Sequence, residues 1–440
     1  MLKSYTGWVQ SVAFSRDGTQ IVSGSYDQSV QVWDASTDAE LKMLKGHTSS
    51  VRSVAFSSNG TQIVSGSDDK SVRVWDASTG AELKVLKGHT RVVNSVIFSR
   101  DDTQIVSGSN DRSVQMWNAS TGAELKMLKG HTSSVNSVAF STDGTQIASG
   151  SGDQSVRVWD ASTGAVLKVL KGYTGQIYSV AFSRDGTQIV SGSDDESVQV
   201  WDISTGTEIK VLKGHYSLVS SVAFSNNGMQ IVSGSYDHTV IIWDISTGVA
   251  INVLKGHTGL VNSVAFSRDG TQIVSGSSDE SVRVWDALTG VHVKVLKGHT
   301  NSVNSVAFSS DGTQIVSGSD DESVRVWNIS TGAKLNELNS HINLVNSVAS
   351  LSSSTQIASG LDNQSVWAHS LVNSIWNLAD TNWIISSQGQ NHLMWVPLAA
   401  QVTEPSNTLV ISRHGFGSVD FQQSMLGDHW VGCYTPLFKV

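Results

Sequence analysis

The sequence predicts an all-β protein built from small four-stranded antiparallel sheets that stack on one another. Each sheet corresponds to a repeat in which tryptophan recurs every 42 residues, at Trp33, Trp75, Trp117, Trp159, Trp201, Trp243, Trp285 and Trp327. Every repeat holds four short runs with Val, Ile, Phe or Trp at alternate positions, as strands do. No segment shows a sustained apolar period of 3.6 residues, so long amphipathic helices are not expected. Because four short strands are too few to be stable alone, neighbouring repeats must pack together.

The second repeat, residues 44–82, shows the predicted strands in order. They are the runs VRSVAFS, TQIVSGS, SVRVWD and AELKVL. Turn residues follow the first three runs: Asn59-Gly60, Asp68-Asp69 and Ser78-Thr79-Gly80. Glycine supplies the positive φ that tight hairpins need, which explains most of the high glycine content.

The repeats divide the chain into three parts. Residues 1–338 hold eight near-identical units without insertion or deletion, and residues 339–400 hold two degenerate ones. The second degenerate unit, Ser374–Pro397, aligns with Ser11–Asp34 without a gap. Residues 401–440 add two strand-like runs. Because Met1-Leu2-Lys3 aligns only with the end of a fourth strand, either this tail supplies the missing strand and closes a ring, or the sequence is one arm of a longer protein.

Composition excludes several classes of protein. The 440 residues carry a formal charge of −9, with 15% charged and 39% hydrophobic residues, which is unlike a disordered chain. The single cysteine, Cys433, excludes an internal disulfide and a cysteine-based zinc cluster. The N-terminus has no apolar signal segment, and no apolar run is long enough to cross a membrane. We expect a cytoplasmic protein, with the nucleus as the alternative.

The repeat resembles the WD40 repeat, which forms one blade of a β-propeller. The resemblance is carried by Gly-His about 28 residues before Trp-Asp, in units of 42 residues. It implies a WD40-type β-propeller of four-stranded antiparallel blades, with eight or more blades in one ring. A seven-bladed ring followed by the start of a second ring is the alternative.

In that family a buried His, Ser, Asp and Trp brace each blade through hydrogen bonds. Two units have a tyrosine, Tyr5 or Tyr173, in place of the histidine, and the ninth has Asn363 in place of the aspartate. We expect those blades to be less tightly braced. The resemblance assigns the complete set to six units: His47, Ser65, Asp69 and Trp75; His89, Ser107, Asp111 and Trp117; His131, Ser149, Asp153 and Trp159; His215, Ser233, Asp237 and Trp243; His257, Ser275, Asp279 and Trp285; His299, Ser317, Asp321 and Trp327.

No pattern indicates a catalytic, metal or cofactor site. A Ser-His-Asp triad is needed once, whereas this set recurs beside a tryptophan in most units. The periodic histidines lie 42 residues apart, without the short spacing of metal ligands. No phosphate-binding P-loop sequence occurs. We therefore expect a protein that is not an enzyme and has no cofactor; a propeller enzyme that uses the mouth of the channel is the alternative.

The charge pattern does not indicate nucleic-acid binding. Removing the eight bracing aspartates leaves 38 − 8 = 30 acidic against 29 basic residues, so the outer surface is nearly neutral. No basic stripe is present that would bind a phosphate backbone. We expect protein or peptide partners, and neither nucleic acid nor membrane.

The candidate binding residues are those that differ between otherwise similar units. In the WD40 family the partner-facing rim lies around three positions of each unit, two at the start of the first strand and one just before the bracing aspartate. Exposed Trp, Tyr and Leu are typical of protein-binding hot spots, although drift among duplicated units is the simpler explanation for any one of them. One patch is Tyr178, Leu218, Tyr236 and Leu260, and another is Trp8 and Tyr26. The rim candidates are Trp8, Tyr26, Arg52, Gln176, Tyr178, Leu218, Tyr236 and Leu260.

The function expected is a non-catalytic scaffold or recognition module that binds protein or peptide partners on the rim. The near-identical units and the degenerate end, with its HLMWVP and NTLVISRHGF segments, also resemble the WD-repeat sensor arms of fungal NACHT-type signalling proteins. That resemblance implies a second hypothesis, a structural or self-associating arm of a larger signalling assembly.

Overall fold

The computed structural model describes residues 7–37 and 39–338, and beyond them ten strands between Val345 and Thr435; side chains are described in residues 7–37 and 39–333. The chain divides into two compact units, Met1–Ser340 and His341–Val440. None of the described residues forms a helix long and apolar enough to span a membrane. The first unit holds all the residues considered as a site below.

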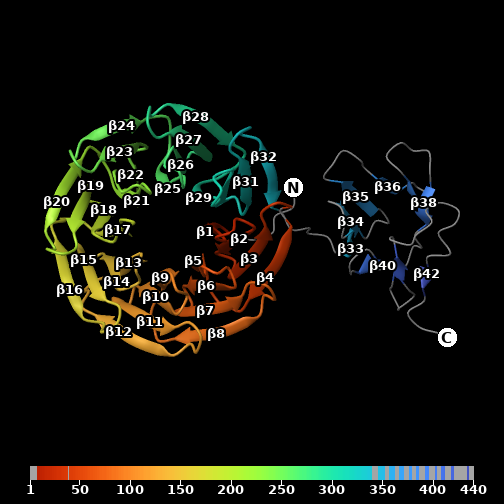
Figure 1. Ribbon diagram of the computed structural model, residues 1–440, viewed down its shortest axis with the longest axis horizontal. Helices are drawn as coiled ribbons and strands as arrows, with labels where there is room; N and C mark the ends of the chain where they lie inside the picture. Colours follow the sequence, from red (N-terminus) through yellow and green to blue (C-terminus); the bar gives the residue numbers. More distant parts are fainter. Residues whose placement is uncertain are drawn as a thin grey trace. The chain divides into compact units, whose positions relative to one another are not determined.

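Residues 7–338 form eight four-stranded antiparallel sheets, each made of four consecutive strands, arranged as the blades of a β-propeller (Figure 1). The eight-bladed ring confirms the predicted fold class. The inner strands are β1 (Val9–Phe14), β5 (Val51–Phe56), β9 (Val93–Phe98), β13 (Val135–Phe140), β17 (Ile177–Phe182), β21 (Val219–Phe224), β25 (Val261–Phe266) and β29 (Val303–Phe308). The second strands are β2 (Gln20–Ser25), β6 (Gln62–Ser67), β10 (Gln104–Ser109), β14 (Gln146–Ser151), β18 (Gln188–Ser193), β22 (Gln230–Ser235), β26 (Gln272–Ser277) and β30 (Gln314–Ser319).

The third and fourth strands complete each blade toward the outside of the ring. The third strands are β3 (Ser29–Asp34), β7 (Ser71–Asp76), β11 (Ser113–Asn118), β15 (Ser155–Asp160), β19 (Ser197–Asp202), β23 (Val240–Asp244), β27 (Ser281–Asp286) and β31 (Val324–Asn328). The outer strands are β4 (Glu40–Lys45), β8 (Glu82–Lys87), β12 (Glu124–Lys129), β16 (Val166–Lys171), β20 (Glu208–Lys213), β24 (Ala250–Leu254), β28 (His292–Lys297) and β32 (Lys334–Leu338).

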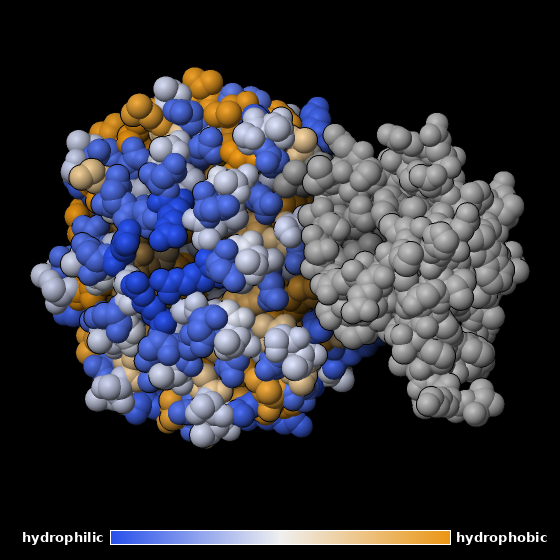
Figure 2. All heavy atoms as spheres, turned by 45° about the vertical axis from the view of Figure 1, so that its right-hand side comes forward, coloured by the Kyte–Doolittle hydropathy of each residue, from blue (hydrophilic) through white to orange (hydrophobic). Residues whose placement is uncertain are grey.

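The hydrophobic core lies between successive blades. Val22, Val30 and Val32 of the first blade, for example, pack with Val51 and the Trp75 side chain of the second. The alternation of side chains along each strand supplies both faces of every blade with Val and Ile, so that each blade is buried on both sides. Figure 2 shows hydrophilic residues around the opening of the ring and hydrophobic residues at its periphery, where outer-strand side chains such as Leu125 and Leu167 are exposed.

The ring closes directly between its first and last blades. Strand β1 packs against β29 and β30, and the backbone N–H of Val12 donates to Ser305 Oγ at 3.2 Å. Gly318 lies so close to β1 that an added Cβ would be 2.6 Å from Val9 Cγ1. The first and last of the eight blades are thus direct neighbours, and the seven-bladed alternative is wrong.

Strands of the second unit pair among themselves. A six-stranded sheet contains β33 (Val345–Leu351), β34 (Gln356–Leu361), β35 (Val366–Ser370), β36 (Trp376–Leu378), β37 (Trp383–Ile385) and β38 (His392–Trp395). A four-stranded sheet contains β39 (Val402–Thr403), β40 (Thr408–Ile411), β41 (Ser418–Asp420) and β42 (Tyr434–Thr435). The strands between residues 345 and 395 thus form one sheet, where the sequence predicts two repeat units.

Candidate functional site

Six blades contain the complete bracing set within one chain of hydrogen bonds. In the second blade, His47 Nδ1 lies 2.7 Å from Asp69 Oδ2, and His47 Nε2 lies 2.7 Å from Ser65 Oγ. The indole N–H of Trp75 donates to the same Ser65 oxygen at 2.8 Å. The same bonds recur at His89, His131, His215, His257 and His299. Each set ties the loop before the inner strand to the second and third strands.

The bracing carboxylates stay ionised well below neutral pH. Burial raises the pKa of Asp69, but hydrogen bonds from His47 and Ser71 outweigh burial and hold it far below the usual value of 3.8. The same opposing causes lower the pKa of five more aspartates, Asp111, Asp153, Asp237, Asp279 and Asp321. With the imidazole Nδ1–H donating to an ionised carboxylate, the Ser65 hydroxyl is left to donate to Nε2.

The order of bonds matches that of a nucleophilic triad, but the serine is inaccessible. Ser65, like its five equivalents, has no exposed surface, and its oxygen already accepts the tryptophan N–H. A nucleophile must reach the carbonyl of a substrate. These sets therefore hold the blades together and do not present a reactive hydroxyl.

Of the three departures from the set, the structure describes one. Tyr5 and Asn363 lie outside the described residues. In the fifth blade, the Tyr173 hydroxyl donates to the Ser191 backbone carbonyl at 2.7 Å and accepts from the Gln199 N–H at 3.1 Å. Tyr173 thus reaches the serine and the third strand, while no hydrogen bond from it to Asp195 is found.

The predicted rim residues lie on one face of the ring. Because the strands of a blade alternate in direction, the starts of the inner strands and the turns between second and third strands share this side, which we name the upper face. The lower face carries the turns between first and second strands and between third and fourth strands. Trp8, Arg52 and Tyr178 flank the starts of inner strands, and Tyr26 and Tyr236 follow second strands.

Several upper-face side chains at the second rim position join neighbouring blades. Asn136 Nδ2 donates to the Ile177 carbonyl of the next inner strand at 2.8 Å, and Asn304 Nδ2 donates to the Val9 carbonyl at 3.0 Å. Asn94, Asn262 and Ser220 make the equivalent bond. We name this bond the interblade clip. Gln10, Arg52 and Tyr178 occupy the same position in the other three blades.

Trp8, Tyr26 and Arg52 form a preformed cluster across the first two blades. The rings of Trp8 and Tyr26 lie 5.2 Å apart at 54°, and the Arg52 guanidinium lies 5.4 Å from the centre of the Tyr26 ring. Asp68 accepts from Arg52 Nε at 2.6 Å and from Nη2 at 3.0 Å. These bonds raise the pKa of Arg52 and fix the guanidinium, while Trp8 remains 47% exposed.

Tyr178, Asp194 and Tyr236 share a second region on the fifth and sixth blades. Burial raises the pKa of Tyr178, and the Asp194 carboxylate raises it further. The inner strands of the two blades, β17 and β21, pack side by side. Gln176 is exposed, whereas Leu218 and Leu260 are half-buried. The backbone N–H of Tyr236 donates to the Leu218 carbonyl at 2.9 Å.

One exposed aromatic side chain on this face is missing from the sequence-based candidates. Tyr216 follows the bracing His215 and is 84% exposed. The other seven units have threonine there, for example Thr48 and Thr90. The divergence between units that identified the rim candidates could have identified Tyr216 too, had it been applied to this position.

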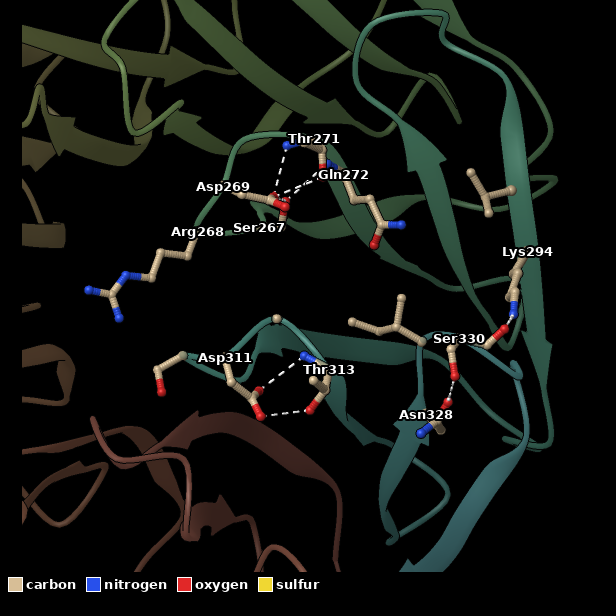
Figure 3. Close-up of a pocket in the computed structure, with 14 residues that line it drawn as sticks. Ser267, Arg268, Asp269, Thr271, Gln272, Lys294, Asp311, Thr313, Asn328 and Ser330 are labelled. Carbon is tan, nitrogen blue, oxygen red and sulfur yellow. Dashed lines mark hydrogen bonds between the residues drawn. The ribbon is translucent and has the colours of Figure 1, made fainter.

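A groove with a volume of about 800 Å³ lies on the lower face, between the seventh and eighth blades. Figure 3 shows its polar groups bonded within their own turns: Asp269 and Asp311 each accept from the threonine two residues later. Arg268 points away from these groups. The described residues contain no group of three metal-ligating side chains. The groove thus holds a set of turns and no evident catalytic arrangement.

Comparisons with known proteins agree with this geometry. The family model "WD domain, G-beta repeat" matches residues 1–34, 39–76, 80–118, 122–160, 164–202, 206–244, 248–286 and 290–328. The crystal structure of the computationally designed Ika8 protein is similar, with 35% identity and a TM-score of 0.68, covering 74% of this chain and 98% of that one. No curated protein matches the chain. The eight matched repeats, the ring of eight blades and the bracing sets together show that the chain belongs to the WD40-repeat family.

Proposed function

We propose that this chain is a protein-interaction module that binds protein or peptide partners on the upper face of its ring and catalyses no reaction. WD40 propellers are generally interaction scaffolds, which supports the coarser part of this proposal. The observation that carries the finer part is the cluster of Trp8, Tyr26 and Arg52, whose side chains are of the types most frequent at binding hot spots.

Two features favour binding by this cluster. Trp8 keeps much of its surface exposed, so it has area to bury against a partner. Asp68 holds the Arg52 side chain, and Arg52 covers Tyr26, so little rotamer freedom remains to be lost on binding. A preformed aromatic and cationic surface therefore supports association at a lower entropic cost than mobile side chains would.

Affinity capture from a lysate, quantified by mass spectrometry, tests the proposal. The wild-type chain is compared with a Trp8→Ala, Tyr26→Ala, Arg52→Ala variant and with a Tyr178→Ala, Leu218→Ala, Tyr236→Ala, Leu260→Ala variant. Alanine at a true hot spot costs about 2 kcal/mol or more in binding. Partners should be lost from at least one rim variant, while thermal unfolding of both variants stays close to that of the wild type.

Two controls decide the interpretation. A lower-face variant, Arg16→Ala with Arg184→Ala, should capture the same partners as the wild type. Trp159→Ala should lower the stability of the fold by about 3–5 kcal/mol, because it removes a buried side chain from a brace. The rim variants should lower binding and leave the stability close to that of the wild type. Identical captured sets from all folded variants, or no enriched protein from the wild type, would contradict the proposed function.

A further inference from the structure

The eight blades provide an internal comparison at the third rim position, just before the bracing aspartate. Three blades have an aspartate there, Asp68, Asp194 and Asp320. Asp68 pairs with Arg52, and Asp320 accepts a hydrogen bond from the Asn304 side-chain amide. In both blades the partner is the residue at the second rim position of the same blade. The protein thus compensates this carboxylate in two of its three occurrences.

Asp194 lacks that compensation. Its Oδ1 atom is buried and has no hydrogen-bond partner in the described residues. The second rim position of its blade is Tyr178, and no hydrogen bond joins the two side chains. Asp194 as a whole is half-buried, and its buried Oδ1 lacks a donor, so an incoming positively charged donor would supply a hydrogen bond that the described residues do not.

Gly175, Tyr178 and Tyr236 lie on the same face of the ring as Asp194. A Cβ at Gly175 would lie 1.8 Å from Asp194 Oδ1 and 2.6 Å from the Asp195 backbone nitrogen, so glycine leaves room for the carboxylate in its present position. Tyr178 replaces the asparagine that forms the interblade clip elsewhere, and Tyr236 comes from the next blade. Strands β17 and β21, which lie next to these groups, pack side by side in the ring (Figure 1).

These groups have the chemistry of a site for a basic side chain. The carboxylate attracts a guanidinium or ammonium group, and the two tyrosine rings offer faces that attract cations. Gln176 belongs to the same blade and is exposed. Its backbone carbonyl accepts a hydrogen bond from the Asp194 N–H at 3.0 Å. A neutral or acidic side chain would leave the charge of Asp194 uncompensated.

We propose that Asp194, Tyr178 and Tyr236 form a subsite for an arginine or lysine side chain of a protein partner. The inference rests on the proposed function, because it names the kind of side chain that the same upper face would bind. The two upper-face clusters then differ in where their cation comes from. The Arg52 cluster carries its own cation paired with Asp68, whereas the Asp194 cluster takes its cation from the partner.

A random dodecapeptide library displayed on phage, selected on the immobilised full chain, tests this inference. The selected peptides should share an arginine or lysine at one aligned position. Their synthetic forms should bind Asp194→Asn about tenfold or more weakly than the wild type, since that change removes the charge and keeps the shape. Asp320→Asn is the matched control, because it makes the same change at the equivalent position of another blade, and it should bind as the wild type does.

The remaining outcomes separate the inference from the proposed function. Peptides that lose binding to the Tyr178→Ala, Leu218→Ala, Tyr236→Ala, Leu260→Ala variant, but bind Asp194→Asn normally or lack a shared basic residue, would overturn the subsite and leave upper-face binding intact. Peptides that bind every upper-face variant equally, or the selection of none, would overturn both. Alanine replacement of the shared basic residue in a peptide should weaken wild-type binding as much as Asp194→Asn does.

Discussion

Tyr173 occupies the place that a buried histidine holds in six other blades, and its longer side chain reaches different partners. The sequence predicts a weaker brace in this blade. The structure shows that one of the two ends of the brace is kept. The Tyr173 hydroxyl lies 2.6 Å from Ser191 Oγ and so retains the bond to the serine. The aspartate end is lost: Asp195 retains bonds from Thr174 and Ser197 but none from residue 173.

Tyr173→His should restore the missing bond and stabilise the fifth blade. The gain expected for one hydrogen bond to a charged group is about 1.5–3 kcal/mol. Hydrogen exchange of amides in β18 and β19 measures this gain. The reverse change, His131→Tyr in the fourth blade, is the control and should lower protection there; unchanged exchange in both variants would mean that the aspartate bond contributes little.

At the scale of strands, every pair of neighbouring inner strands is joined in the same way. A backbone N–H of one inner strand donates to a serine hydroxyl of the preceding one at all eight junctions, for example from Val54 to Ser11 Oγ at 3.3 Å. The interblade clip adds a second bond at five of them. The junctions without a clip follow the blades of Gln10, Arg52 and Tyr178, so two of the three carry the side chains proposed to bind partners.

Removal of a clip should weaken the ring by a similar amount wherever it occurs. Asn304→Ala at the closing junction and Asn136→Ala at an internal one should each lose about 1 kcal/mol from the clip, because each leaves a carbonyl without its donor. Asn304→Ala should lose about 1 kcal/mol more, because it also removes the donor to Asp320. Urea unfolding followed by tryptophan fluorescence measures both. Gln10→Ala, at a junction without a clip, should have little effect. A loss for Asn304→Ala that exceeds the loss for Asn136→Ala by much more than the Asp320 bond would show that closure depends on a bond unlike the others.

Features that recur in every repeat could be predicted from the sequence, and features that vary between repeats could not. Each blade could be predicted, since its strands, turns and bracing residues recur in register. The clips could not be predicted, because Asn94, Asn136, Asn262 and Asn304 stand at variable rim positions that indicate contact with a partner. Their amides instead donate to carbonyls of the next inner strand, 41 residues away for the first three and 295 residues away for Asn304. Sequence variation alone does not distinguish a residue that binds a partner from one that binds the next blade.

At the scale of the whole molecule, closure could not be decided from sequence for a related reason. The bond from Val12 to Ser305 joins the same residue types as the bond from Val54 to Ser11, although 293 residues separate the first pair and 43 the second. A seven-bladed or an eight-bladed ring would be closed by identical groups. The number of blades therefore depends on the curvature of the whole ring, and it cannot be predicted from the sequence of one unit.

Acid should destabilise the whole ring cooperatively. The six bracing aspartates have folded pKa values below the usual 3.8, and hydrogen bonds from Ser78 and Thr79 lower the pKa of the turn residue Asp76 to about 2. Because the unfolded chain then binds more protons than the folded one, their stabilising contribution is full above about pH 4 and is lost as the pH falls through the folded values. The melting temperature should drop steeply between about pH 4 and pH 2.

Circular dichroism at a series of pH values measures this dependence. The loss should be steeper than for a variant in which one brace is removed, such as Asp153→Asn, because fewer carboxylates then take up protons. A melting temperature that is constant down to about pH 2, or that falls mainly between pH 7 and 6, would contradict the assignment to the aspartates.

Because the same backbone-to-serine hydrogen bond joins the inner strands at all eight junctions, no blade is structurally the first of the ring. Any loop between an outer strand and the next inner strand is equivalent to the junction between the last blade, which ends with β32, and the first, which begins with β1. A circularly permuted chain that opens between Lys171 and Gly172, with Asn339 joined to Ser4, preserves the 42-residue period across the new joint. Such a permutant should assemble the same eight blades, with the Arg52 and Asp194 clusters on the same face and in the same order around the ring.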